Sequence, residues 1–155
     1  MAKTSRSLTS SELREARAIF RNSIDYNAMK IYEGKAYFFQ PNNVAMAPNG
    51  NIYFPTPIYR PDFSISVSAM AFLIHEMTHV WQIQKGVWLK LQRVLIDGGD
   101  YDYDLDPAKR LQDYKIEEQA SLVEDYYRLQ HGLTARHGSG PLADYRTIVD
   151  TAMTA

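Results

Sequence analysis

The sequence predicts an α+β fold in which a small antiparallel sheet packs on a buried helix. Residues 71–84 are mostly apolar and contain neither Gly nor Pro, which is typical of a buried helix. Residues 29–54 contain short apolar runs divided by turn residues, which is typical of short strands. Residues 114–130 show the pattern of a second long helix. Together these segments predict one small sheet and two central helices.

Length and composition indicate one globular domain. The chain has 155 residues, enough for one domain with a real core and too few for two ordinary ones. It is 45% hydrophobic and 23% charged, as globular proteins commonly are. Residues 1–8 are small, polar and basic, so we expect this end to be flexible.

The same properties argue against several classes of function. The net charge of −1 argues against nucleic acid as the main partner, because phosphate binding needs a basic surplus. No apolar run approaches the length of a membrane span without a charge, so we expect none. The N-terminal segment lacks the apolar core of a secretory signal. Action outside the cytoplasm would therefore need another export route.

The first regular element is predicted to be a helix. Thr9 and Glu12 form a capping box, T-x-x-E, and predict a helix from about Ser10 to Arg21. Its apolar side is expected to face the core, with Glu12 on the solvent side.

Strand signals follow this helix. Short strands are predicted at 29–31, 36–39, 44–47 and 52–54. Asn49-Gly50, between the last two, predicts a type I′ hairpin turn, because these residues tolerate positive φ angles.

Capping residues bound the later helices. Ser64 or Ser66 should start the central helix, and Gly86 should end it. The helix at 114–130 should end at Gly132, and a short final helix is predicted at 142–153.

The segment between the two long helices has weaker signals. Val87–Ile96 is apolar and predicts a short helix or a strand. Asp100–Asp106 has alternating aspartates that resemble a calcium loop, but Leu105 stands where Gly is needed and Leu111 where Glu is needed. A short exposed strand is therefore predicted there. Asp106-Pro107 then predicts the start of a helical segment.

The central helix carries a motif with a chemical meaning. His75, Glu76 and His79 form the pattern H-E-x-x-H. Residues four apart lie on one face of a helix, so the two imidazoles can bind one metal ion. Glu76 then lies beside the open metal position, where a carboxylate can take a proton from water. This is the arrangement of a zinc hydrolase.

A catalytic zinc site needs a third protein ligand. The chain has no cysteine, so this ligand must be His, Asp or Glu. Glu117 and Glu118 lie on the downstream helix, at opposite edges of its core face, and helical geometry does not decide between them. His131 and His137 are less attractive, because one abuts a helix end and the other lies in a Gly-rich segment.

The motif HEMTHVWQ is followed about forty residues later by Y-x-x-E-x-Q-A. This combination resembles the gluzincin-type zinc metallopeptidases. It is similar to the small metallopeptidase-like domains associated with Vgr/Rhs elements of bacterial type VI secretion. The resemblance runs from about Leu8 to Gly132. The matching residues are 48–54, 75–82, Tyr114, Glu117, Gln119, Ala120, Asp125 and Tyr126.

The resemblance implies a zincin-like fold and a ligand set. The family pattern E-x-x-A falls on Glu117 and Ala120. It therefore implies that Glu117, with His75 and His79, holds one Zn²⁺ ion per chain. In such a fold the sheet can offer an edge strand to an extended substrate, although a purely structural sheet is an equal alternative.

The sequence departs from the family pattern at one position and leaves one role open. Ser121 stands where an Asp is expected, four residues after the third ligand. Glu124, one turn further, is a candidate for orienting a ligand histidine, with a solvated glutamate as the alternative. Tyr53, Tyr114 and His137 are candidates for a transition-state donor.

We therefore expect a zinc metallopeptidase with Glu76 as general base. The resemblance implies an antibacterial toxin that is exported by type VI secretion and acts in the periplasm of the target cell. The expected partners are a peptide or protein substrate, a spike protein and a cognate immunity protein. One alternative is a peptidoglycan amidase or endopeptidase. Another is a non-catalytic, zinc-stabilised binding module in which His131 or His137 is a fourth ligand.

Overall fold

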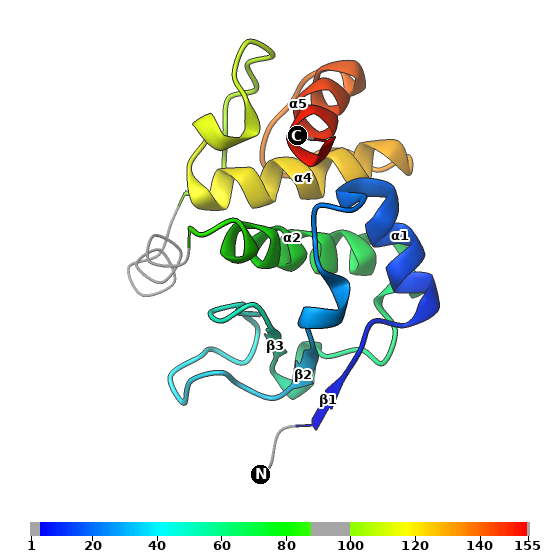
Figure 1. The fold of residues 1–155 in the computed structure, drawn as a ribbon, viewed down its shortest axis with the longest axis vertical. Coiled ribbons are helices and arrows are strands. Elements are labelled where there is room, and N and C mark those ends of the chain that lie inside the picture. The colour runs from blue at the N-terminus through cyan, green and yellow to red at the C-terminus, as the bar shows by residue number, and fades with distance from the viewer. Residues whose placement is uncertain (1–3, 88–99, 155) are drawn as a thin grey trace.

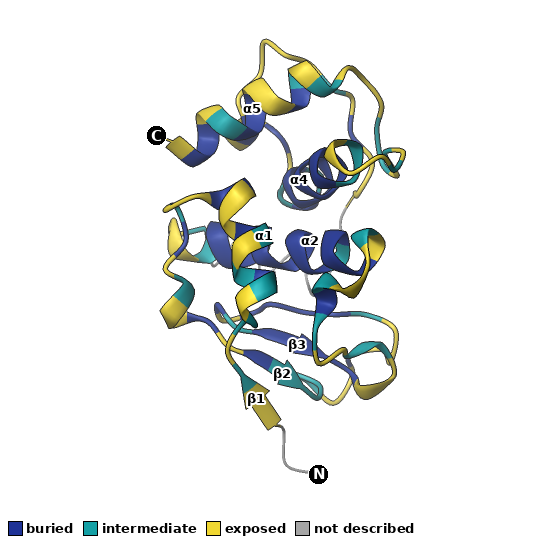
Figure 2. Cartoon of the chain, turned by 90° about the vertical axis from the view of Figure 1, so that its right-hand side faces the viewer, coloured by how far each residue is buried: buried dark blue, intermediate teal, exposed yellow. Residues whose placement is uncertain are grey.

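The computed structural model describes residues 4–87 and 100–154, which form an α+β fold. Its elements are β1 (Thr4–Arg6), α1 (Ser10–Phe20), β2 (Ile31–Glu33), β3 (Ile52–Phe54), α2 (Val67–Gln84), α4 (Ile116–Gln130) and α5 (Leu142–Thr154), joined by loops and short 3₁₀ turns. Figure 1 shows α2 and α4 side by side, with the sheet on the other side of α2. Figure 2 shows α5 beyond α4. The central helix is thus covered on both sides.

The sheet is mixed, which corrects the predicted antiparallel sheet. Its strand order is β1-β2-β3. β1 runs antiparallel to β2, whereas β2 and β3 are parallel, with Ile31 opposite Ile52. The long connection at 34–51 returns the chain to the start of β2, so β3 runs in the same direction as its neighbour.

The predicted strands at 36–39 and 44–47 do not form, apart from one antiparallel bridge between Met46 and Tyr53. A buried side chain explains the difference. The amide of Gln40 accepts a hydrogen bond from Ala36 N (2.7 Å) and donates to the carbonyls of Val44 (2.7 Å) and Tyr53 (3.1 Å). These bonds satisfy loop backbone that would otherwise need a strand partner.

The turn before β3 also differs from the prediction. Gly50 has a φ of 87°, but Asn49 does not have a positive φ, so the turn is not type I′, which needs positive φ at both central residues. The Asn49 side chain instead accepts a hydrogen bond from Asn51 N at 3.2 Å, a local bond that Asn commonly makes in turns.

The N-terminal segment contains β1, and its Arg6 is bound to α1. Arg6 donates to both carboxylate oxygens of Glu12, at 2.8 and 3.0 Å. The same carboxylate accepts from Thr9 N and Phe63 N, both at 2.8 Å. The predicted capping box is therefore confirmed. However, Glu12 is fully buried rather than solvated, because these bonds compensate its burial.

The caps of the helices agree well with the predictions. Ser66 is the N-cap of α2, and its hydroxyl accepts from Ala69 N at 3.1 Å. Gly86 follows the end of α2 with a φ of 93°, and Gly132 follows α4 with a φ of 84°. Positive φ is the conformation that glycine favours after a helix. The final helix α5 is present as predicted.

The segment before α4 was predicted less well. The prediction for Val87–Ile96 lies outside the described residues beyond Val87. Residues 100–106 form no strand, and residues 107–109 form a turn instead of a helix start. Tyr114 explains part of this, because its hydroxyl binds the backbone N and O of Asp106, at 2.8 and 3.1 Å. A 3₁₀ turn, Leu111–Asp113, then leads into α4.

One apolar core joins the sheet to the helices. Its largest fully buried side chains include Phe20 from α1, Phe54 from β3, Leu73 and Met77 from α2, and Tyr145 from α5. Within the described parts of the chain, no helix combines the length and apolar character that a membrane crossing needs.

Candidate metal centre

The motif helix places its histidines in the interior. His75 and His79 are only 6% and 2% exposed, and Glu76 is 5% exposed. They lie on α2, which packs between the sheet and α4, so most side chains of this helix are buried. Polar groups in such a position need partners or a bound ion.

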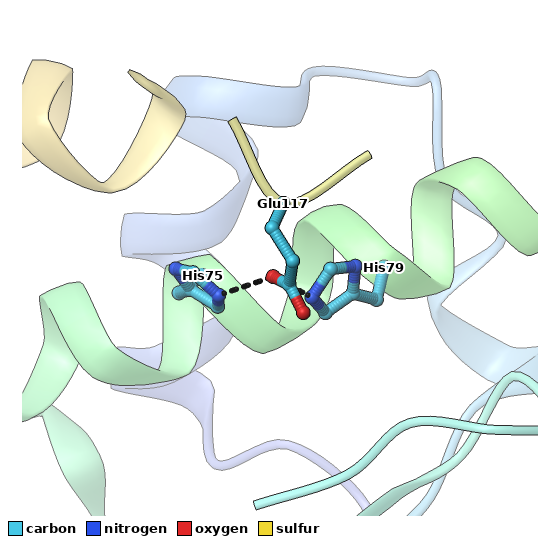
Figure 3. Close-up of side chains that lie close together, drawn as sticks. All are labelled: His75, His79 and Glu117. Atoms are coloured by element: carbon cyan, nitrogen blue, oxygen red, sulfur yellow. Dashed lines mark hydrogen bonds and ion pairs between the residues drawn. The ribbon is translucent and has the colours of Figure 1, made fainter. Parts of the chain in front are cut away.

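The partner is Glu117, in the first turn of α4 (Figure 3). Its Oε1 lies 3.1 Å from Nε2 of His75 and 2.9 Å from Nε2 of His79. The ligand atoms of these three residues all lie within 4.8 Å of one another. Two imidazoles and one carboxylate form a ligand set that zinc uses in catalytic sites with an open position. The chemistry of the donor set therefore fits a bound metal ion.

The structure distinguishes the two glutamates that the sequence left open. The Oε1 atom of Glu118 accepts a hydrogen bond from Lys115 N at 2.8 Å and caps the N-terminus of α4. Its side chain therefore faces the helix end, while Glu117 faces the histidines. His131 lies elsewhere, with its ring against that of Tyr127. In residues 4–87 and 100–154, the metal-ligand group contains three members and no fourth.

Each histidine is held by a second partner through Nδ1. Glu124 Oε1 lies 2.9 Å from His75 Nδ1, so the orienting carboxylate lies one turn beyond Ser121, as the sequence suggested. Gln82 Oε1 lies 2.8 Å from His79 Nδ1, and its amide N donates to Gln119 at 3.0 Å. Sequence analysis missed this role of Gln82, although it lies three residues after His79 on the same helix face.

Exchanging Glu124 for glutamine should weaken Zn²⁺ binding about 10- to 100-fold, as loss of such an outer partner commonly does. Glutamine keeps the size of the side chain but removes the charge that holds the His75 proton on Nδ1. Competition against a chelating indicator measures the affinity, with the exposed Asp104→Asn as control. A change of less than about twofold would show that Glu124 does not support the site.

Carboxylates set the charge of the histidines in the metal-free protein. Burial alone lowers the pKa of His75, but Glu117 and Glu124 outweigh burial and raise it to about 10. Burial also opposes the shift at His79, where Glu117 raises the pKa. The pKa of Glu117 lies well below its usual range, because the two histidines outweigh the effect of burial. Burial raises the pKa of Glu76 to about 7, against the lowering effect of both histidines.

Binding of Zn²⁺ at pH 7 should release at least one proton, because His75, which its raised pKa keeps protonated, must bind a metal in the neutral form. Calorimetric titration in buffers of different ionisation enthalpy measures this number.

The metal-free protein should lose stability as the pH rises from about 6.5 to 10. A raised histidine pKa stabilises the fold only while His75 is protonated. Binding without proton release would contradict this charge assignment.

The candidate centre opens into a cavity of about 310 Å³. Its walls include His75, Glu76, Tyr101, Arg136 and His137. The Oε2 atom of Glu76 is buried and has no hydrogen-bond partner in the described part of the chain. Glu76 also lines the cavity, together with the ligand candidate His75. A carboxylate in this position can accept a hydrogen bond from a water or a substrate group.

Of the predicted transition-state donors, only His137 lines this cavity. Tyr114 binds the backbone of Asp106. The Tyr53 hydroxyl accepts from Asn49 Nδ2 at 3.1 Å. Neither tyrosine lines the cavity. Tyr101 does line it and was missed, because nothing in the alternating aspartate segment marks one tyrosine as different from its neighbours.

A second cavity, of about 510 Å³, lies apart from this chemistry. Its walls include Trp81, Lys85, Tyr114 and Lys115, and it contains neither Glu76 nor a ligand histidine. Size therefore does not select the candidate site. The convergence of the histidines and glutamates selects the smaller cavity.

The fold and the site together define an α+β domain with a buried His-His-Glu group that can bind a metal ion. No protein-family model matches the sequence. The solved effector domain of Pseudomonas aeruginosa VgrG2b is 35% identical, with a TM-score of 0.75, and the match covers 92% of this chain and 80% of that one. The chain therefore belongs to the family of the VgrG2b effector domain.

The chain is also similar to the complete protein that carries that domain. It is 38% identical over 134 residues to the type VI secretion system spike protein VgrG2b of Pseudomonas aeruginosa strain PAO1. The match covers 81% of this chain but 13% of the spike protein. The likeness thus concerns an effector domain of type VI secretion and a small part of the length of the spike.

Proposed function

We propose that this chain is a zinc-dependent peptidase and that it acts as a type VI secretion effector. One observation carries the enzymatic part of the proposal. A buried carboxylate oxygen of Glu76 has no partner in the described residues, and Glu76 lines a cavity together with His75, one member of the His75, His79 and Glu117 group. A purely structural metal site needs no such base, and its ligand set is commonly closed by a fourth residue.

The residues of the site would have distinct roles in metal binding and proton transfer. His75, His79 and Glu117 hold the ion, with Glu124 and Gln82 fixing the imidazoles. Zinc bound there would polarise a scissile carbonyl and lower the pKa of water toward about 7. Glu76 accepts a proton from the attacking water and passes it to the leaving amine. The interior position of Glu76 excludes bulk water and strengthens its interactions with charged groups.

The family relationship supports the delivery route. A spike protein of type VI secretion carries the related domain, so association with a spike is part of the proposal. The proposal also includes action in the periplasm of a competing cell. An immunity protein would neutralise the effector. The fold assigned in this proposal is zincin-like, since a motif helix and a second ligand-bearing helix lie side by side on one side of a small sheet (Figure 1).

The proposal is tested with the full chain loaded with Zn²⁺. The protein is incubated with a mixture of unfolded proteins and, separately, with purified cell-wall sacculi. Protein cleavage that stops with a chelator and returns with added Zn²⁺ would support the peptidase. Release of soluble muropeptides alone would replace it with the peptidoglycan hydrolase. No zinc-dependent cleavage of either material would overturn the enzymatic proposal and favour a binding module.

A further inference from the structure

The cavity contains a polar group that the proposed chemistry has not yet used. Attack on a peptide carbonyl places negative charge on its oxygen, and hydrogen-bond donors aimed at that oxygen stabilise the transition state. The donors that line the cavity outside the metal-ligand group belong to Asn43, Tyr101, Arg136 and His137. Their existing partners distinguish them.

Two of these donors are already engaged. Arg136 Nη1 donates to Glu124 Oε2 at 3.1 Å. His137 Nδ1 lies 3.2 Å from Asp102, and its Nε2 faces the carboxylate of Glu124 at 3.7 Å. Asn43 and Tyr101 are both exposed, but the Tyr101 ring stacks against that of His75, a proposed ligand. The Tyr101 hydroxyl makes no hydrogen bond within residues 4–87 and 100–154, although its ring is about half covered.

The ring of Tyr101 lies close to two imidazoles, which both contact Glu124. Its centroid is 5.9 Å from that of His75, with the planes at 29°, and 5.9 Å from that of His137, with the planes at 32°. Aromatic pairs interact favourably at such distances. One neighbour is a proposed metal ligand and the other lines the same cavity. The contacts fix the ring beside the metal centre while the hydroxyl stays available.

The loop that supplies His137 is itself rigidly held. The buried carboxylate of Asp125 accepts from Arg136 N at 2.7 Å, His137 N at 3.0 Å and Tyr103 OH at 2.7 Å. Tyr103 N in turn donates to the His137 carbonyl at 3.1 Å. A side chain on Gly138 would overlap the Tyr103 ring. His137 is therefore held beside Tyr101 by Asp125 of α4, without the need for a substrate.

We infer that Tyr101 is a substrate-contacting catalytic residue, whose phenol donates a hydrogen bond to the oxygen of the attacked carbonyl. His137 is its positioning residue, because its imidazole lies against the Tyr101 ring. This inference rests on the proposed peptidase function and adds a donor to it. No bond forms or breaks at Tyr101, and the phenol keeps its proton throughout.

The test compares Tyr101→Phe with Tyr53→Phe, in the full Zn²⁺-loaded chain. Phenylalanine keeps the aromatic stack and removes only the hydroxyl. We expect Tyr101→Phe to lower kcat about 100-fold, with KM, zinc content and thermal stability close to wild type. Tyr53→Phe should keep kcat within about twofold, because Tyr53 does not line the cavity.

Binding of acetohydroxamate provides a second readout that needs no substrate. This probe chelates zinc and presents oxygens to neighbouring donors. Tyr101→Phe should weaken it about 10-fold or more, as loss of a hydrogen bond to a charged group does. Wild-type kcat and hydroxamate affinity in Tyr101→Phe would overturn the role of Tyr101 alone. Absence of zinc-dependent cleavage and of hydroxamate binding in the wild-type protein would overturn the peptidase proposal, and the inference with it.

Discussion

Glu117→Ala is expected to abolish stoichiometric zinc binding, while Glu118→Ala retains about one ion per chain. The Glu117 carboxylate contacts both histidines of α2, at 3.1 and 2.9 Å, whereas Glu118 caps the N-terminus of α4. Removal of a direct ligand should cost more than the 10- to 100-fold that an outer partner costs. Elemental mass spectrometry after gel filtration measures zinc per chain, and a chelator competition gives the affinity.

The two substitutions should also differ in their effect on folding. Glu118→Ala removes a cap and should cost roughly 0.5–2 kcal/mol. Glu117→Ala removes the carboxylate between two buried histidines, so Glu117→Gln is the better test of the ligand, because it keeps the side-chain volume. Thermal unfolding of all three metal-free proteins shows which of them fold. Full zinc content in a folded Glu117→Gln variant would remove Glu117 from the ligand set.

The sequence predicted the helical part of the fold because helix signals are local. The capping box at Thr9, the cap at Ser66 and the glycines at 86 and 132 each act within a few residues. The apolar run of the motif helix also indicated its buried position. These features depend on the chain's own periodicity and caps, and α2, α4 and α5 follow them closely.

The sheet was predicted poorly because its partners are distant in sequence. β2 pairs with β1 on one side and β3 on the other, and neither register can be read from the strand itself. Gln40 shows the same limit, since one buried amide holds a loop whose residues favour strands. An apolar, aromatic run such as 36–39 has high strand propensity, but tertiary context overrides it.

The site residues show the same contrast between local signals, which can be read from the sequence, and tertiary packing, which cannot. The H-E-x-x-H spacing fixes two imidazoles on one helix face, so His75 and His79 could be assigned from local geometry. The choice between Glu117 and Glu118 could not, since it depends on how α4 rotates against α2. Tyr101 was missed because its role arises from packing across elements. Gln82 lies three residues after His79 on α2, so its contact follows helix spacing, whereas its bond to Gln119 depends on α4.

Glu76→Gln is expected to retain zinc and lose about 10²- to 10⁴-fold in kcat/KM, the usual contribution of a general base. Glutamine has nearly the same shape and should fit a site where Glu76 is 5% exposed. It cannot accept a proton from water at neutral pH. The carboxylate oxygen that lacks a partner in the described residues would become an amide, so binding geometry persists while proton transfer stops.

Four measurements test this outcome and separate it from simple misfolding. Zinc per chain should stay near one and acetohydroxamate affinity within about tenfold of wild type, because the ligands are untouched. Glu76→Asp should recover part of the activity. Aspartate restores a carboxylate, although its shorter side chain places that carboxylate farther from the attacking water. Production of each variant in the periplasm of a susceptible bacterium gives a cellular readout. If Glu76→Gln stays as active and as toxic as wild type, the base lies elsewhere, and the H-E-x-x-H helix supplies metal ligands alone.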